Sequence, residues 1–197
     1  MNLPEKLDVA RQLEALGVDI IEAGFAIVSP EDFQSVEAIS RAVSKCTVAS
    51  LARCGKKDID AAWNALKQAK KPRIHVFIAT SDIHMEYKLR MTREEVLQSI
   101  RENVAYAKSL CDDIEFSAED ASRSDRAFLA ECYSAAVAAG AATLNVPDTV
   151  GYCTPEEMYD LIRYLKEHVR GVENVDISVH CHDDLGLAVA NSLACVR

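Results

Sequence analysis

Short apolar runs rich in β-branched residues alternate with longer segments of helical periodicity along the whole chain. The apolar runs predict six strands, at residues 18–24, 46–52, 73–80, 113–120, 141–148 and 176–183. The segments between them predict helices at residues 3–16, 31–43, 58–69, 92–110, 125–139 and 155–169, with a further helix opening at Leu185. Strict alternation without hairpin signals predicts a parallel sheet with right-handed crossovers, in a single domain over residues 1–197.

The two faces of the predicted strands differ in polarity. In residues 176–183, Ser178, His180 and His182 share one face, because neighbouring strand residues point in opposite directions, and the other face is apolar. The same division recurs in the strands at 73–80, 113–120 and 141–148. An open doubly wound sheet needs apolar residues on both faces, whereas in a barrel the face of the sheet that lines the lumen can be polar. We therefore expect an α/β fold of the (β/α)8, or TIM, barrel type, with the site at the carboxyl ends of the strands.

The number of predicted strands falls short of a closed barrel. A TIM barrel has eight strands and typically about 250 residues. This chain of 197 residues offers six strands, opens on a helix pattern and stops within another. We therefore expect an incomplete barrel, an internal fragment of a longer catalytic domain.

Composition narrows the class of protein. A chain that is 49% hydrophobic can bury a core, and a net charge of −9 argues against nucleic acid or an anionic membrane as partner. No stretch reaches the roughly 18 apolar residues of a membrane span. The seven scattered cysteines form no C-x-x-C pair, and the N-terminus is not signal-like, which indicates a reducing cytoplasmic or organelle-matrix setting. An anionic substrate would need a local positive centre.

His180 and His182 are the sharpest chemical signal. Alternate positions on one strand place both imidazoles on one face, where they could ligate one divalent cation. H-x-H alone is a weak motif, and two polar surface histidines are the simpler alternative. The pair lies at the carboxyl end of the last predicted strand, on the face that also carries His75, Glu119 and Thr149. The following acidic residue, Asp183 or Asp184, is expected to cap the next helix rather than bind metal.

Other polar residues of the same strands are candidates for acid–base and binding roles. Glu119 is nearer the expected mouth than Glu115, which is as well explained by a structural pairing with Arg73. Thr149 and Asn145 could hold a substrate carboxylate, although Thr149 is equally consistent with a turn residue. His84, Lys88 and Arg90 could supply positive charge, with a solvated loop as the commoner explanation.

These residues belong to a set of motifs that resembles the 2-isopropylmalate synthase family, nearly from end to end. The motifs are Ile21-Glu22-Ala23-Gly24-Phe25 with Ser29-Pro30 and Asp32-Phe33, Ala79-Thr80-Ser81-Asp82-Ile83-His84-Met85 with Lys88-Leu89, Glu115-Phe116-Ser117 with Glu119-Asp120-Ala121, Asn145-Val146-Pro147-Asp148-Thr149-Val150-Gly151, and His180-Cys181-His182-Asp183-Asp184-Leu185-Gly186-Leu187-Ala188.

The resemblance implies a metal-dependent Claisen condensation. Acetyl-CoA would attack 3-methyl-2-oxobutanoate, and thioester hydrolysis would release 2-isopropylmalate and CoA, the first committed step of leucine biosynthesis. By the family pattern His180 and His182 ligate a divalent metal, Mn²⁺ or Mg²⁺ ahead of Zn²⁺. Glu119 is the catalytic acid or base, and His75, Ser117 and Thr149 bind the 2-oxo acid. The parent enzyme is expected to be a homodimer.

The chain also departs from the family pattern. The family's Arg-Asp-Gly-Glu-Gln and Gly-Glu-Arg-Ala-Gly-Asn segments and its C-terminal regulatory region have no counterpart here, so we expect the chain alone to be inactive. Ala26 and Glu31 replace the usual proline and glycine, which bears on the identity of the keto acid. Homocitrate or citramalate synthase, a lyase or aldolase of the same superfamily, and a truncated non-catalytic barrel remain as alternatives.

Overall fold

The computed structural model describes residues 1–197 and contains one parallel sheet of six strands in the order β1-β2-β3-β4-β5-β6. The strands are β1 (Ile20–Gly24), β2 (Thr47–Arg53), β3 (Pro72–Ala79), β4 (Ile114–Glu119), β5 (Thr143–Asp148) and β6 (Asp176–Cys181). Because every strand pairs with its neighbour in sequence, the order never reverses as it does in a doubly wound sheet. The six strands predicted from the sequence are confirmed.

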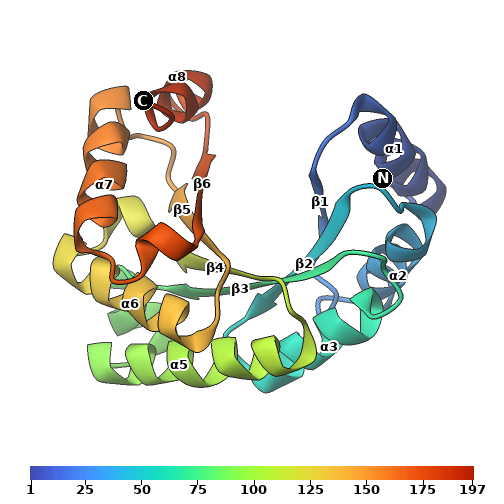
Figure 1. Cartoon of the computed structure of the whole chain (residues 1–197), viewed down its shortest axis with the longest axis horizontal. Coiled ribbons are helices and arrows are strands. Elements are labelled where there is room, and N and C mark those ends of the chain that lie inside the picture. The colour runs from blue at the N-terminus through green and yellow to red at the C-terminus, as the bar shows by residue number, and fades with distance from the viewer.

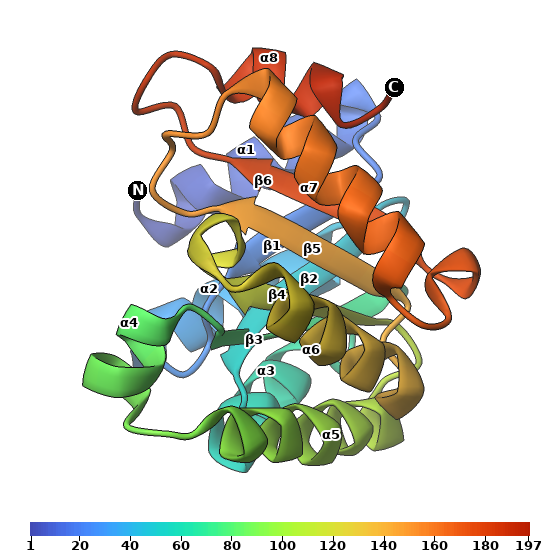
Figure 2. The ribbon, with the colours of Figure 1, turned by 90° about the vertical axis from the view of Figure 1, so that its left-hand side faces the viewer.

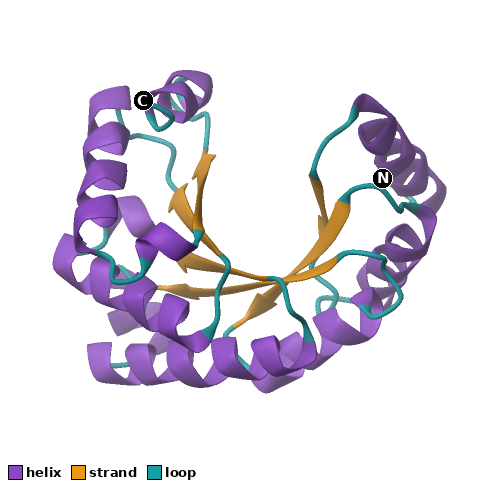
Figure 3. Cartoon of the chain, viewed as in Figure 1, coloured by secondary structure: helices purple, strands orange, loops and turns teal.

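The sheet curls into an open half-barrel with its helices on the convex side (Figure 1). The long helices are α1 (Leu3–Leu16), α2 (Pro30–Ala42), α3 (Lys56–Leu66), α5 (Arg93–Leu110), α6 (Arg126–Ala139), α7 (Pro155–His168) and α8 (Ala188–Ala194). Figure 3 shows the helices as an outer arc and the strands as an inner arc, with the concave face of the sheet left uncovered. The predicted barrel-type fold with six strands is confirmed.

Helix starts follow the capping signals in the sequence. Asn2, Thr92 and Thr154 each cap a helix and form a capping box with a glutamate three residues later. Helix α8 begins at Ala188 rather than at the predicted Leu185, because Gly186 takes a left-handed turn (φ 71°). The N-cap position is Leu187, which makes no side-chain cap bond, and neither Asp183 nor Asp184 occupies it. The Asp183 side chain nevertheless accepts from the N–H of the first helical residue, Ala188, at 3.0 Å.

Residues 82–91 do not form the predicted loop. They contain a short helix, α4 (Asp82–His84), and a π-helical turn, η1 (Met85–Leu89), which ends at Arg90 in the left-handed region (φ 55°). Figure 2 shows α4 at one end of the molecule, beyond the row of long helices. Two 3₁₀ turns, η2 (Ala121–Arg123) and η3 (Val172–Asn174), complete the structure.

One apolar core lies between the sheet and its helices. The rings of Phe116 and Tyr133 meet edge to face at 6.0 Å, and both residues are fully buried. The Tyr133 hydroxyl donates to the Asn145 carbonyl at 2.7 Å, which ties α6 to β5. No helix is both long and apolar enough to cross a membrane.

Candidate active site

A chain of hydrogen bonds crosses the concave face of the sheet. Glu22 Oε2 lies 2.5 Å from His75 Nδ1, and His75 Nε2 lies 2.7 Å from Ser117 Oγ. Asn145 Nδ2 donates to the same Ser117 oxygen at 2.6 Å. These four residues come from β1, β3, β4 and β5, and β1 does not pair with β3, so the contact between Glu22 and His75 depends on the curl of the sheet.

The groups at the two ends, the Glu22 carboxylate and the Asn145 amide, set the donor and acceptor roles along this series of hydrogen bonds. A carboxylate only accepts, so His75 donates through Nδ1, and in the neutral imidazole its Nε2 accepts. Ser117 then donates its proton to His75 and accepts from the Asn145 amide. His75 and Ser117, each 5% exposed, are therefore fixed in orientation with their partners satisfied inside the lumen.

Arg73 occupies the deeper part of the lumen. It pairs with Asp113 at 3.0 Å and with Glu115 at 3.2 Å, and both Arg73 and Glu115 are largely buried. Burial would lower the pKa of Arg73, but the two carboxylates outweigh it and raise the pKa. Glu115 is thus a structural carboxylate below the site.

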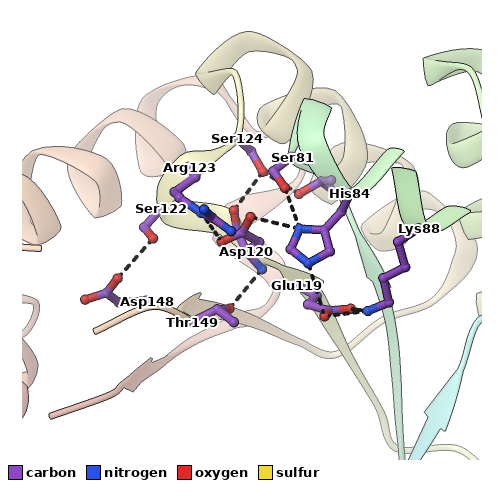
Figure 4. Close-up of polar contacts among 11 residues, drawn as sticks. Ser81, His84, Lys88, Glu119, Asp120, Ser122, Arg123, Ser124, Asp148 and Thr149 are labelled. Atoms are coloured by element: carbon purple, nitrogen blue, oxygen red, sulfur yellow. Dashed lines mark hydrogen bonds and ion pairs between the residues drawn. The ribbon is translucent and has the colours of Figure 1, made fainter. Parts of the chain in front are cut away.

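Glu119 lies at the end of β4 and pairs with Lys88. The Lys88 ammonium donates to both Glu119 oxygens, at 2.7 and 2.8 Å, and His84 Nε2 lies 4.0 Å from Oε1 (Figure 4). The segment is helical rather than a loop, and although it is largely exposed, α4 and η1 hold His84 and Lys88 against the end of β4. π-Turns of this kind occur often at functional sites.

Thr149, just after β5, is joined to the residue that follows Glu119. The Asp120 N–H donates to Thr149 Oγ1 at 2.9 Å, and the Asp120 carboxylate accepts from Arg123 at 2.7 Å and His84 at 3.0 Å (Figure 4). Nearby, the fully buried Asp148 accepts from the Ser122 hydroxyl at 3.0 Å.

His180 and His182 stand side by side at the end of β6. Their rings are 4.9 Å apart and nearly parallel, at 14°. Partial burial, and then repulsion from His182, lower the pKa of His180, which favours the neutral imidazole that binds metals. No group of three or more His, Cys, Asp or Glu residues in the chain could hold a metal, and His180 and His182 could supply two donors to one.

Gly151 lies directly against this pair. Its φ is +64°, and a Cβ there would lie 2.9 Å from His182 Cβ and would overlap Asp184 Oδ2. The loop after β5 therefore packs against the loop after β6 at a position that only glycine fits without strain.

Comparison with known proteins agrees with this geometry. The sequence model of the HMGL-like family matches residues 1–197. The chain belongs to the HMGL-like family. It is 61% identical to the 2-isopropylmalate synthase of Pyrococcus furiosus and 58% identical to that of Ruminiclostridium cellulolyticum, over 197 residues in each case. The matches cover all of this chain but 40% and 39% of those relatives.

Solved structures support the same fold. The hydroxymethylglutaryl-CoA lyase of Pseudomonas aeruginosa superposes with a TM-score of 0.80 at 21% identity, over 98% of this chain and 66% of that one. An HMG-CoA lyase from Acinetobacter baumannii, solved with coenzyme A and 3-methylmalate, gives a TM-score of 0.77 at 17% identity, over 98% of this chain and 64% of that one.

The structure groups the six predicted site residues into separate contacts. His75 and Ser117 are hydrogen-bonded, His180 and His182 are stacked, and Glu119 and Thr149 each bond to another partner. The site prediction did not include Glu22, although its position in an apolar strand is a usable signal. It also missed Asp120, whose role depends on a backbone conformation that the sequence does not display.

Proposed function

We propose that this chain forms the central part of the active-site barrel of a 2-isopropylmalate synthase. In that reaction acetyl-CoA condenses with 3-methyl-2-oxobutanoate, and hydrolysis of the thioester gives 2-isopropylmalate and CoA for leucine biosynthesis. One observation supports the proposal: in a chain 61% identical to a named synthase, strands of one parallel sheet carry His75, Ser117, Glu119 and His180, and Thr149 and His182 directly follow β5 and β6.

His180 and His182 fit a divalent cation such as Mn²⁺ or Mg²⁺ as two neighbouring imidazole donors, and further donors would have to come from outside this pair. When bound, such a cation polarises the keto carbonyl and offsets the negative charge that develops on its oxygen. With only this pair present, we expect weak metal affinity and little activity from the chain alone.

The other side chains orient the substrate and move protons. Thr149 has a free hydroxyl proton to donate to the carboxylate or keto oxygen of the 2-oxo acid. His75 and Ser117 form a fixed polar wall beside it. Glu119 takes the proton from the methyl group of acetyl-CoA, with a lone pair on either oxygen that the bonds from the Lys88 ammonium leave free.

An apolar space beside Glu119 suits the branched part of the substrate. A cavity of about 220 Å³ opens there, lined by Phe77, Leu89 and Met91 together with Arg53, Lys88 and Glu119. Its two cations already have partners, since Arg53 pairs with Asp58 and Lys88 pairs with Glu119. Apolar walls favour an alkyl group over the second carboxylate of a larger 2-oxo acid, because burying an unpaired charge is costly.

A segment exchange tests the function. Residues 1–197 replace the aligned segment of the Pyrococcus furiosus synthase, and release of free CoA from acetyl-CoA is followed with 3-methyl-2-oxobutanoate, pyruvate or 2-oxoglutarate, with Mn²⁺ or with a chelator. We expect metal-dependent release with 3-methyl-2-oxobutanoate, lost in His180→Ala. His168→Ala is the matched control, because His168 is an exposed histidine at the end of α7 that bonds to Tyr164. A folded exchange protein that releases no CoA with any 2-oxo acid would refute the proposal, and preference for another 2-oxo acid would reassign the substrate.

A further inference from the structure

Asp120 has an unusual backbone conformation at the mouth of the lumen. It follows β4 directly, with φ 67° and ψ 34°, in the left-handed region. Arg90 is the only other non-glycine residue with positive φ. This region is unfavourable for residues with a Cβ, and such conformations persist where the surrounding structure fixes them. A fully buried aspartate in this conformation therefore needs a structural cause.

Side-chain and carbonyl contacts fix Asp120 on several sides. The carboxylate accepts from Arg123 Nε at 2.7 Å and from His84 Nδ1 at 3.0 Å, and the carbonyl accepts from the Ser124 hydroxyl at 3.0 Å (Figure 4). Burial would raise the pKa of Asp120, but hydrogen bonds from Arg123 and Ser81 outweigh burial and lower it. The ionised carboxylate thus anchors the left-handed turn to η2 and to α4.

The Asp120 N–H rejoins two strands that have separated. The register between β4 and β5 runs only from Glu115 opposite Thr143 to Ser117 opposite Asn145. Further along β5, Pro147 has no N–H to donate. The bond from Asp120 N–H to Thr149 Oγ1, at 2.9 Å, therefore spans the strand ends beyond the ladder.

This bond also determines which hydrogen-bonding role the Thr149 hydroxyl can take toward a ligand. A hydroxyl group has one proton to donate and lone pairs to accept with. Thr149 Oγ1 accepts from Asp120, and its proton has no acceptor within the chain. The free proton is thus available to a ligand, and the group is already oriented before that ligand binds.

We propose that Asp120 is a positioning residue: its left-handed backbone aims its N–H at Thr149 Oγ1 and so presents the Thr149 hydroxyl as a donor to the 2-oxo acid. The proposal rests on the proposed function. Asp120 does not touch the substrate; it acts through Thr149, and Arg123 and His84 hold it in place.

Steady-state kinetics of the exchange protein test this role. We expect Asp120→Ala to raise KM for the 2-oxo acid about tenfold, the loss of one well-placed hydrogen bond to a charged group, with smaller changes in kcat and in KM for acetyl-CoA. Thr149→Val should have the same effect, and the double variant should be no worse than Thr149→Val alone. Thr149→Ser should retain the low KM.

Two further variants distinguish a specific loss of Thr149 positioning from a general disturbance of the loop. Asp125→Ala removes the N-cap of α6 in the same loop, where Asp125 accepts from Phe128 N–H, and should leave KM for the 2-oxo acid unchanged. Asp120→Gly tolerates the left-handed backbone, so it should keep a lower KM than Asp120→Ala. The proposal would be overturned if Asp120→Ala and Asp125→Ala raised KM for the 2-oxo acid equally. It would also be overturned if the increases in KM from Asp120→Ala and Thr149→Val multiplied in the double variant.

Failure of the proposed function has a separate signature. If the unsubstituted exchange protein turns over no 2-oxo acid, the synthase assignment fails whatever the variants do. Urea unfolding of the full chain then tests the contact itself with the same double-mutant cycle. Non-additive shifts for Asp120→Ala and Thr149→Val would support the orienting bond, and additive shifts would overturn it.

Discussion

Gly151 offers a sharp test of how the loop after β5 supports His180 and His182, the pair for which we propose metal binding. Replacing it with alanine has two costs. A left-handed backbone costs an L residue about 1–2 kcal/mol. The new Cβ would also lie 2.9 Å from His182 Cβ, an atom that moves only if the end of β6 moves, and overpacking of this kind adds about 1–3 kcal/mol. We therefore expect Gly151→Ala to lower the free energy of unfolding by about 2–5 kcal/mol.

Gly186 is the matched control for the backbone term. Its φ is +71°, it lies in the loop that follows His182, and a Cβ there would meet nothing within 4 Å. Gly186→Ala should therefore lose only the left-handed cost of about 1–2 kcal/mol. Urea unfolding of both variants gives the difference directly, provided that their m-values agree. A second comparison, Gly151→Ala in an Asp184→Ala background, removes the flexible carboxylate and leaves the contact with His182.

Metal affinity gives the functional side of the same test. Titration of the segment-exchange protein with Mn²⁺ should show weaker binding for Gly151→Ala than for Gly186→Ala, because only the former displaces His182. Equal losses of stability in the two glycine variants would refute the packing argument. Unequal stability with equal metal affinity would refute the link between this loop and His182.

Three further predictions concern the core, acid stability and the thiols. Phe116→Ala, at a fully buried position against Tyr133, should cost about 3–5 kcal/mol in urea unfolding. Hydrogen bonds from the N–H groups of Lys45 and Ser44 lower the pKa of Glu14. The stabilisation from these bonds is therefore complete above the unfolded pKa of about 4.3 and is lost as pH falls through the folded pKa. The difference in free energy of unfolding between the unsubstituted chain and Glu14→Gln should accordingly disappear in acid. Burial raises the pKa of Cys54 to about 12, so its reaction with a thiol reagent at pH 8 should be much slower in the folded chain than in urea.

The sequence predicted the sheet and its lumen face well, because both depend on a local pattern. Ile74, Val76 and Ile78 alternate with His75 along β3, and burial confirms this alternation, since the three apolar residues lie in the core while His75 faces Glu22 and Ser117. Strand ends shifted by a residue or two, as at β6, which ends at Cys181. His182 therefore lies just past the strand, and its place depends on the close approach of Gly151 as well as on the bond from its own N–H to the Asp148 carbonyl.

The missed features depend on geometry that has no local pattern. Periodicity does not distinguish a π-turn from a polar loop, so the contact between Lys88 and Glu119 was not predicted. The contact between Glu22 and His75 joins strands that do not pair, and it follows from sheet curvature. Asp120 reads as the last residue of the strand predicted at 113–120, although its left-handed backbone links the ends of β4 and β5.

The apolar core thus fixes part of the site and leaves the rest to loops. A slip of one residue in β3 would turn His75 to the helices and move Ile74 or Val76 into the lumen, at the cost of several buried side chains. His75, Ser117 and Asn145 are held by that register, which is why parity alone located their face. Thr149 and His182 lie past the strand ends, beyond the regular hydrogen-bond ladder. There the Asp120 N–H holds Thr149, and the close approach of Gly151 holds His182. Substitutions in the outer helices should therefore affect stability first, whereas those in the two loops should affect ligand binding at smaller losses of stability.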